Sequence, residues 1–172
     1  GIVDQMRDSG FPGQMLGLDS QAAFIEGDKI KCKEVLGNRV PFAPAWTKVD
    51  AKDWQRVKAV ILNYLRDFGG AVLKFPYSAG GKGARVILDG WETKTVYNQL
   101  MADYKKDYKK IHKNGEWPLL IEARMAGFEI SFTALIDGNG NYALLPTALD
   151  YPGRFEGPPS SNNPVTGGMG SV

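Results

Sequence analysis

The feature that most constrains the fold is a glycine-rich segment between two short apolar runs. Residues 71–75 and 84–88 alternate in the manner of β-strands, and residues 77–83 between them contain three glycines. Two short strands joined in this way predict an antiparallel hairpin. Glycines let backbone N–H groups approach an anion, and Lys74 and Lys82 at the two ends would neutralise phosphate charge. The alternative is a hairpin tip whose lysines serve solubility.

This segment is not a Walker A loop, because Gly83 follows Lys82 where that loop has Ser or Thr, and a strand follows where it has a helix.

Elsewhere apolar residues at helical spacing predict the end of a helix at 1–10, a helix from Asp19 or Ser20 to Leu36, a helix capped by Asp50 and ending at Gly69, and a helix at 92–113. Strands are expected at 119–122, 129–136 and 142–149, with Asn139-Gly140 as a hairpin turn. The order predicts an α+β fold, an antiparallel sheet with helices.

Composition excludes several classes of function. The chain of 172 residues has one cysteine, Cys32, and one histidine, His112, so a disulfide framework within it and a Cys/His zinc cluster are excluded. No apolar run approaches the length of a membrane helix, and a net charge of +2 is too small to indicate nucleic acid. The lysine-rich stretch at 105–113 is typical of a solvated helix face, with RNA binding as a remote alternative. A reducing cytoplasm is the expected compartment, and the sequence predicts no oligomeric state.

Two carboxylates flank the predicted crossover after the strand at 119–122. Glu122 can accept from an adenine amino group, and Glu129 from ribose hydroxyls, if both face one cleft. Backbone at Ala123 and the side chains of Met125 and Phe75 would then contact the base. The alternative is a pair of exposed glutamates at strand ends. Lys33 can reach a phosphate from the other side of the cleft, or it is an ordinary surface lysine.

The tail combines charged residues with exposed backbone donors. Asp150 and Arg154 precede a run of small residues, Thr166, Gly167, Gly168 and Met169. Such a loop can hold a small polar substrate beside the phosphates. The alternative is a disordered linker, because the stretch is rich in Pro, Gly, Ser and Asn.

Together these segments resemble the ATP-grasp superfamily. Residues 28–33 look like the helix that supplies its first ATP lysine, and residues 73–83 look like its second lysine and phosphate-covering loop. Residues 122–129 are similar to its E-x-x-x-x-G-x-E segment. Within the superfamily the chain most resembles the phosphoribosylamine–glycine ligase family. The residues that carry this match are Gly1, Val3, Asp4, Met6, Gly10, Ala22-Ala23, Glu26-Gly27, Lys29, the strand 120–132 and the P-x-T-G-G-M-G motif at 164–170.

The chain also departs from the family pattern. Lys74-Phe75-Pro76-Tyr77 stands where the family has K-A-D-G, residues 150–154 where it has D-H-K-R, and Val165 where it has asparagine. These departures bear on the substrate more than on the nucleotide. The opening strands of the family and its E-x-N magnesium motif have no counterpart in the sequence.

The resemblance implies an ATP-grasp-like fold with a glycine-loop lid subdomain. It divides the chain into 1–47, the end of an N-terminal region and linker helix; 48–125, the lid subdomain; and 126–172, the truncated start of the second subdomain. It implies ATP binding by Lys33, Lys74, Ser78, Gly80, Gly81, Lys82, Glu122, Ala123, Met125 and Glu129. Lys74, Lys82 and Arg154 would be catalytic, and Asp150 with Thr166, Gly167, Gly168 and Met169 would bind substrate.

The implied reaction joins glycine to phosphoribosylamine through an acyl phosphate. ATP and Mg²⁺ are the implied cofactors, with magnesium ligands expected beyond Val172 and none within the chain. The opening residues read as the middle of a helix, so we expect a fragment of a longer enzyme. Two alternatives stay open: another ATP-grasp carboxylate–amine ligase, and a non-catalytic nucleotide-binding fragment.

Overall fold

A computed structural model of the chain describes residues 2–41, 43–77, 83–108, 115, 117–151, 153, 155–156 and 170–171. The helices are α1 (Ile2–Asp8), α2 (Ser20–Gly27), α3 (Lys29–Leu36), η1 (Gly37–Arg39), α4 (Trp54–Phe68), η2 (Gly90–Glu92) and α5 (Thr93–Tyr108). The strands are β1 (Trp46–Asp50), β2 (Ala71–Lys74), β3 (Ala84–Ile87), β4 (Pro118–Ala123), β5 (Glu129–Ser131), β6 (Ala134–Ile136), β7 (Tyr142–Leu144), β8 (Ala148–Asp150) and β9 (Gly170–Ser171). Within the described part of the chain, no helix has the length and apolarity needed to cross a membrane.

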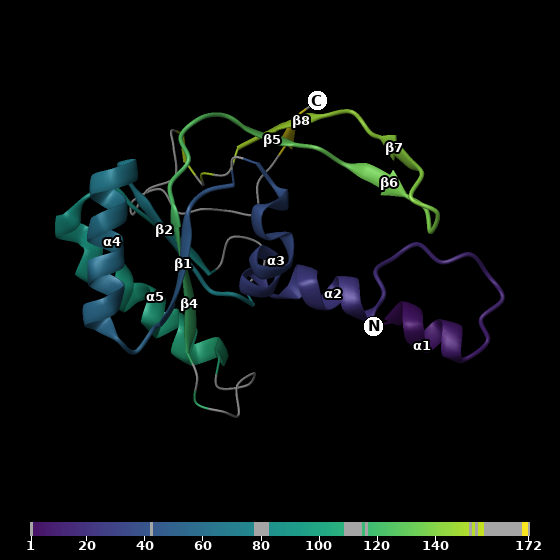
Figure 1. The fold of residues 1–172 in the computed structure, drawn as a ribbon, viewed down its shortest axis with the longest axis horizontal. Helices are drawn as coiled ribbons and strands as arrows, with labels where there is room; N and C mark the ends of the chain where they lie inside the picture. Colours follow the sequence, from purple (N-terminus) through teal and green to yellow (C-terminus); the bar gives the residue numbers. More distant parts are fainter. Residues whose placement is uncertain are drawn as a thin grey trace.

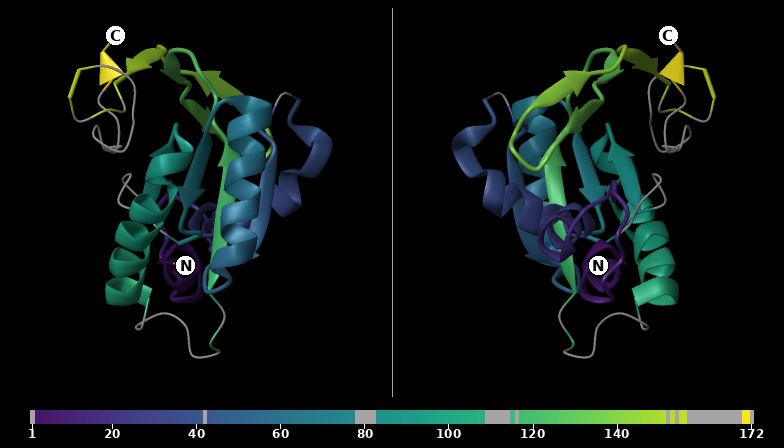
Figure 2. Two further views of the ribbon diagram at one scale, coloured as in Figure 1. Left: turned by 90° about the vertical axis from the view of Figure 1, so that its left-hand side faces the viewer. Right: turned by 90° about the vertical axis from the view of Figure 1, so that its right-hand side faces the viewer.

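The centre of the molecule is a four-stranded antiparallel sheet in the order β1-β4-β2-β3. Helices α4 and α5 cover one face of this sheet, and α3 lies on the other side, with α2 and α1 extending away from it (Figures 1 and 2). The predicted hairpin is confirmed, because β2 and β3 pair antiparallel from Ala71 opposite Ile87 to Lys74 opposite Ala84. The last residues of β2 therefore point at the glycine-rich loop.

Helix α4 forms because its sequence supplies a cap, an apolar stripe and a stop. The Asp53 carboxylate accepts from the N–H of Arg56 at the start. Gly69 ends the helix in the left-handed conformation, with φ of 69°, and its N–H donates to Leu65. The buried residues of the stripe face the sheet at helical spacing: Val57, Val60, Ile61 and Tyr64.

Strand β4 is buried along its whole length because both of its faces are covered. Leu119 and Ile121 belong to the apolar core between the sheet and the helices α4 and α5. Since side chains alternate along a strand, Leu120 and Glu122 point to the opposite face, where α3 lies. This alternation places a buried carboxylate on the side of the sheet away from the main core.

Residues after β4 form a thin antiparallel arm that rises above the four-stranded sheet (Figure 2). Its parts are the sheet β5-β8-β9 and the hairpin β6-β7. Asp137 closes the hairpin turn by accepting from the N–H groups of Asn139 and Asn141, and Gly140 adopts a φ of 84°. The Asn139-Gly140 turn is therefore confirmed. Many large apolar side chains of the arm are exposed, including Ile130, Phe132, Ile136 and Leu144.

Three sequence-based boundaries were wrong. The helix expected up to Leu36 is two helices, because Asp28 leaves the helical conformation and its carboxylate caps α3 by accepting from Ile30 and Lys31. Asp50 ends β1 and does not cap α4, a role that Asp53 performs. The strands expected at 129–136 and 142–149 are each divided in two. Their outer halves, β5 and β8, pair with each other in the sheet that also contains β9, and their inner halves form the β6-β7 hairpin.

The α+β class is confirmed, since helices pack on antiparallel sheets. The four-stranded sheet with α4 and α5 occupies residues 46–123, which overlaps the predicted subdomain at 48–125. The division into 1–47, 48–125 and 126–172 stays a prediction.

Candidate nucleotide-binding site

Two lysines from distant parts of the chain meet at one buried carboxylate. The Nζ of Lys33 in α3 contacts Oε1 of Glu122, and the Nζ of Lys74 at the end of β2 contacts Oε2. Glu122 is 3% exposed. A carboxylate this deeply buried requires charged or hydrogen-bonding partners, and here each oxygen has one. The structure thus brings together three residues that the sequence placed in one ATP site.

The sheet register explains the contact with Lys74. Glu122 lies opposite Val72 on β2, and Lys74 lies opposite Leu120 two residues along. The side chains of Lys74 and Glu122 are therefore diagonal neighbours on the same face, within reach of a long side chain. On the other side of β4, Trp46 of β1 lies directly opposite Glu122.

Helix α3 brings Lys33 to the same place. Its first turn is held by the Asp28 cap, and the N–H of Lys29 donates to the carbonyl of Pro76 at 3.0 Å. This bond ties the start of α3 to the segment that leads into the glycine-rich loop. Lys33 is one turn further along the helix and hence on the same face as Lys29.

These side chains border a cavity of about 530 Å³, a size typical of sites for small ligands. One part of its wall is charged, with Lys29, Lys33, Lys74 and Glu122. Another part is apolar, with Leu36, Val40, Pro41, Pro44 and Trp46. A cavity with a cationic part and an apolar part suits a ligand with an anionic part and a flat apolar part.

The electrostatics of the site follow from burial and from the three ammonium groups. Burial by itself raises the pKa of Glu122, but the charges and hydrogen bonds of Lys74 and Lys33 outweigh it, so the net pKa is lowered. The pKa of Lys29 is also lowered, first by burial and then by the like charge of Lys74, against the opposing effect of Glu122. The site is therefore crowded with positive charge, which an anionic ligand would relieve.

The base of the glycine-rich loop is well fixed. The N–H of Phe75 donates to the carbonyl of Gly83, and the Phe75 ring stacks on Tyr104 with the ring centroids 3.9 Å apart. The expectation that Phe75 forms a wall for a nucleobase was wrong. Phe75 follows Lys74 on the strand and so points into the core beneath α5. The predicted loop residues Ser78, Gly80, Gly81 and Lys82 lie outside the described residues.

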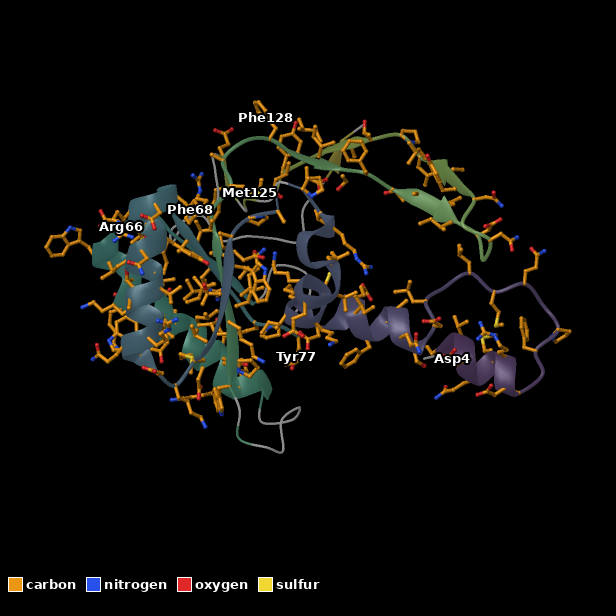
Figure 3. The ribbon with its side chains drawn as sticks, in the orientation of Figure 1. Asp4, Arg66, Phe68, Tyr77, Met125 and Phe128 are labelled. Atoms are coloured by element: carbon orange, nitrogen blue, oxygen red, sulfur yellow. The ribbon has the colours of Figure 1, made fainter. Side chains whose placement is uncertain are left out.

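The structure places the other predicted nucleotide contacts around the start of the arm. Ala123 is buried, and its N–H donates to the carbonyl of Ala45. Met125 is 65% exposed on the connection from β4 to β5, and Phe128 on the same connection projects outward and is 90% exposed (Figure 3). Glu129 is exposed on β5 and does not line the cavity around Glu122. The two predicted carboxylates are thus not brought together in this structure.

Of the predicted substrate residues, the structure describes Asp150. It lies on β8 opposite Glu129 and opposite Gly170 of β9, and its carboxylate accepts from the Ser131 hydroxyl at 2.5 Å. Gly170 near the end of the chain therefore lies beside Asp150. The remaining predicted residues, Arg154, Thr166, Gly167, Gly168 and Met169, lie outside the described residues.

Sequence reasoning missed most of the residues that line the cavity, among them Lys29, Cys32 and Trp46. The four-residue spacing of Lys29 and Lys33 places them on one helix face and could have identified Lys29. No sequence pattern indicated that Trp46 lines the cavity, because its position opposite Glu122 depends on the pairing of two strands that are far apart in the sequence. Among the residues that the structure describes, no cluster of three or more His, Cys, Asp or Glu side chains could hold a metal ion.

Comparison with known proteins agrees with this geometry. Residues 27–172 match the family described as phosphoribosylglycinamide synthetase, ATP-grasp (A) domain. The chain is 30% identical over 99% of its length to phosphoribosylamine–glycine ligase from Methanobrevibacter smithii, covering 36% of that protein. It is also 30% identical to the ligase of the same name from Rhodopirellula baltica, over 99% of this chain and 37% of that one. The chain spans about a third of the length of these relatives.

A solved structure extends the comparison to the fold. D-alanyl-alanine synthetase A from Vibrio cholerae superposes with a TM-score of 0.64 at 13% identity, over 87% of this chain and 40% of that one. At this identity the likeness concerns the fold alone. The family match is what confirms the expected ATP-grasp-like architecture. The family match covers far more than half of the residues, and so the chain belongs to the phosphoribosylglycinamide synthetase ATP-grasp (A) domain family.

Proposed function

We propose that this chain is the ATP-binding portion of a carboxylate–amine ligase that joins glycine to 5-phosphoribosylamine in de novo purine synthesis. The observation that carries the proposal is the convergence of Lys33 and Lys74 on Glu122 beside a cavity that both charged and apolar side chains line. Family membership and the names of the relatives supply the reaction. The substrates are small molecules, and the proposed compartment is the cytoplasm.

In the proposed reaction, the glycine carboxylate attacks the γ-phosphate of ATP, giving an acyl phosphate and ADP. The amine of phosphoribosylamine then attacks the acyl carbon, a proton leaves the nitrogen, and phosphate departs from the amide. The main task of the protein is to hold charged groups in line and to screen negative charge. Lys74 and Lys33, with Lys29 beside them in the cavity wall, would screen the nucleotide phosphates.

The remaining roles are proposed from the sequence. Lys82 and the backbone of Ser78, Gly80 and Gly81 would cover the phosphates, and closure of this loop would exclude water. Glu122, Ala123, Met125 and Glu129 would contact the nucleoside. Approach of Met125 and Glu129 to the cavity would require the arm to move toward it, because both are exposed in this structure.

The acceptor side of the site is proposed around the end of the arm. Asp150 and the run Thr166, Gly167, Gly168 and Met169 would bind the substrate, and Arg154 would be catalytic beside them. The pairing of Gly170 with Asp150 supports this grouping, since it returns the tail to β8. Mg²⁺ is the proposed companion of the ATP phosphates. The described residues offer no cluster of metal ligands, so no step of the reaction is assigned to a metal held by them.

One observation favours a second candidate, a ligase of the same superfamily with a different amino-acid substrate. Phe75 and Pro76 stand where the family pattern has Ala and Asp, and both have structural roles here. Phe75 stacks on Tyr104, and the Pro76 carbonyl accepts from Lys29. The Phe75 side chain therefore gives the base of the loop a core contact that the alanine of the family pattern could not make.

Two measurements test the proposal. Calorimetric titration with a non-hydrolysable ATP analogue should show binding that Lys74→Met weakens and that Lys58→Met, on the exposed side of α4, does not. Release of ADP by the full-length enzyme should depend on glycine together with phosphoribosylamine. ADP release with another amino acid in place of glycine would favour the second candidate, and absence of nucleotide binding would contradict both.

A further inference from the structure

The carboxylate of Glu122 is an anion that two lysines of the cavity already hold. Both of its oxygens engage ammonium groups, one from Lys33 and one from Lys74. The side chain of Glu122 is 4% exposed, whereas those of Lys33 and Lys74 are 19% and 32% exposed. The carboxylate is thus the inner partner, and the lysines reach it from the cavity side.

The ion pairs of Glu122 make the binding free energy of an anion without hydrogen-bond donors less favourable. A polyphosphate that binds Lys33 and Lys74 must displace the carboxylate of Glu122 from them. A buried carboxylate that loses its charged partners is strongly destabilised. A ligand that also offers Glu122 a hydrogen-bond donor removes that cost, because the carboxylate exchanges one set of donors for another. The amino group of an adenine is such a donor, and inorganic polyphosphate has none.

We propose that Glu122 determines the specificity of this site by acting as an internal counter-ion of Lys33 and Lys74. It weakens the binding of phosphate and polyphosphate to these lysines, and a ligand that also carries a base with an amino group escapes this effect. The inference rests on the proposed binding of ATP. It adds that recognition of the base and recognition of the phosphates are coupled through one carboxylate. Glu122 is a positioning residue for Lys33 and Lys74 in the absence of nucleotide and a specificity-determining residue in its presence.

The test compares two ligands on matched variants. Inorganic tripolyphosphate and a non-hydrolysable ATP analogue are titrated calorimetrically into the wild-type chain, Glu122→Gln and Glu34→Gln. Glutamine has the shape of glutamate and can still accept from an amino group, but it cannot hold two ammonium groups as a counter-ion. Glu34→Gln removes the same charge from α3, at a half-exposed side chain that faces Lys31 at 3.6 Å.

We expect Glu122→Gln to bind tripolyphosphate at least about tenfold more tightly than wild type, which corresponds to one charge-assisted contact. The ATP analogue should gain much less, so the preference for ATP over tripolyphosphate should shrink. Glu34→Gln should change both affinities by less than about threefold. An equal gain for both ligands, or the same gain in both variants, would overturn the proposal, since a general change of charge would then explain it.

A second variant guards against misfolding of Glu122→Gln. Glu122→Asp keeps the charge, but its side chain is one methylene shorter and cannot reach both lysines at once. It should show a smaller gain for tripolyphosphate in the same direction, and an unchanged ratio of the two affinities would contradict the inference. If wild type does not bind the ATP analogue, the proposed function fails. If wild type binds it and the ratio stays constant in both variants, only the counter-ion role fails.

Discussion

Glu122 and Lys74 are diagonal neighbours on adjacent strands and meet on the face of the sheet that α4 and α5 leave uncovered. Ile121, the residue before Glu122, points into the apolar core on the opposite face of the sheet. The strand that builds the core therefore also presents the carboxylate. Lys33 reaches the other oxygen of Glu122 from α3. The position of α3 against the sheet is therefore fixed in part by the ion pair that the nucleotide would have to open.

The first prediction concerns Lys29, which lines the cavity but was not among the residues expected to bind ATP. Lys29→Met should weaken binding of an ATP analogue about tenfold or more, because it removes a cation from the part of the cavity where the phosphates are proposed to bind. Lys31→Met is the matched control, since Lys31 lies on the same helix and pairs at the surface with Glu34. It should change the affinity less than about threefold. If calorimetric titration showed the same change in affinity for both substitutions, Lys29 would not be part of the nucleotide site.

A related expectation distinguishes Lys29 from a residue that merely supports the fold. Its pKa is lowered by burial and by Lys74, so at neutral pH the folded state bears a cost for keeping this ammonium charged. That cost disappears as pH rises through the lowered pKa toward the ordinary value of 10.5. Lys29→Met should consequently be at least as stable as wild type at pH 7, measured by urea unfolding. A marked loss of stability would assign Lys29 a structural role.

The second prediction follows from the lowered pKa of Glu122. A carboxyl whose pKa is lower in the folded state than its ordinary value of 4.5 stabilises the fold fully above that value and loses this contribution as pH falls through the folded pKa. Protonation would also leave Lys33 and Lys74 close together without their counter-ion. The difference in unfolding free energy between wild type and Glu122→Gln should therefore shrink as pH falls from about 5 toward 3. Urea titrations across that range measure it, and a constant difference would refute the link.

Local sequence signals predicted the elements better than their boundaries. The stripe of α4, the β2-β3 hairpin and the turn at Gly140 are each encoded by neighbouring residues, and all three are present. The division of the expected helix at Asp28 was missed, because an aspartate inside an apolar pattern gave no sign that its carboxylate would cap a new helix. The division of the long strands in the arm depends on which partner each half meets, and β9 comes from the far end of the chain.

The site was predicted in part for the same reason. Lys33, Lys74 and Glu122 were identified by motif spacing, and the structure brings them together. The direct pairing of Lys33 with Glu122 was not foreseen, because it depends on how α3 packs on the sheet. Phe75 was wrongly expected to contact the nucleobase because it follows Lys74 in the sequence. Side chains alternate along an extended chain, so the side chains of Phe75 and Lys74 point to opposite faces of the sheet.

The third prediction concerns the buried hydrogen bond of Tyr104, whose ring packs on Phe75 at the base of the glycine-rich loop. The Tyr104 hydroxyl donates to the carbonyl of Pro118 at 2.8 Å in the core, and its ring stacks on Phe75. Tyr104→Phe keeps the stack and leaves that buried carbonyl without this donor, so it should destabilise the fold by about 1–3 kcal/mol. Tyr142→Phe, at a ring that is 70% exposed, should change stability by less than about 0.5 kcal/mol. Thermal and urea unfolding measure both, and equal effects would show that the buried hydrogen bond contributes nothing.

The fourth prediction concerns the sharp end of α4. Gly69 has a φ of 69°, and a Cβ built there would meet nothing within 4 Å, so the cost of a side chain at this position would come from the backbone alone. Gly69→Ala should destabilise the protein by about 1–2 kcal/mol, the penalty for an L-residue in the left-handed region. Gly138 provides the control, because it also has open space around it but does not have a positive φ. Gly138→Ala should be neutral or slightly stabilising through the unfolded state. If Gly69→Ala proved as stable as wild type in urea unfolding, the left-handed cap would not be what ends α4 and turns the chain into β2.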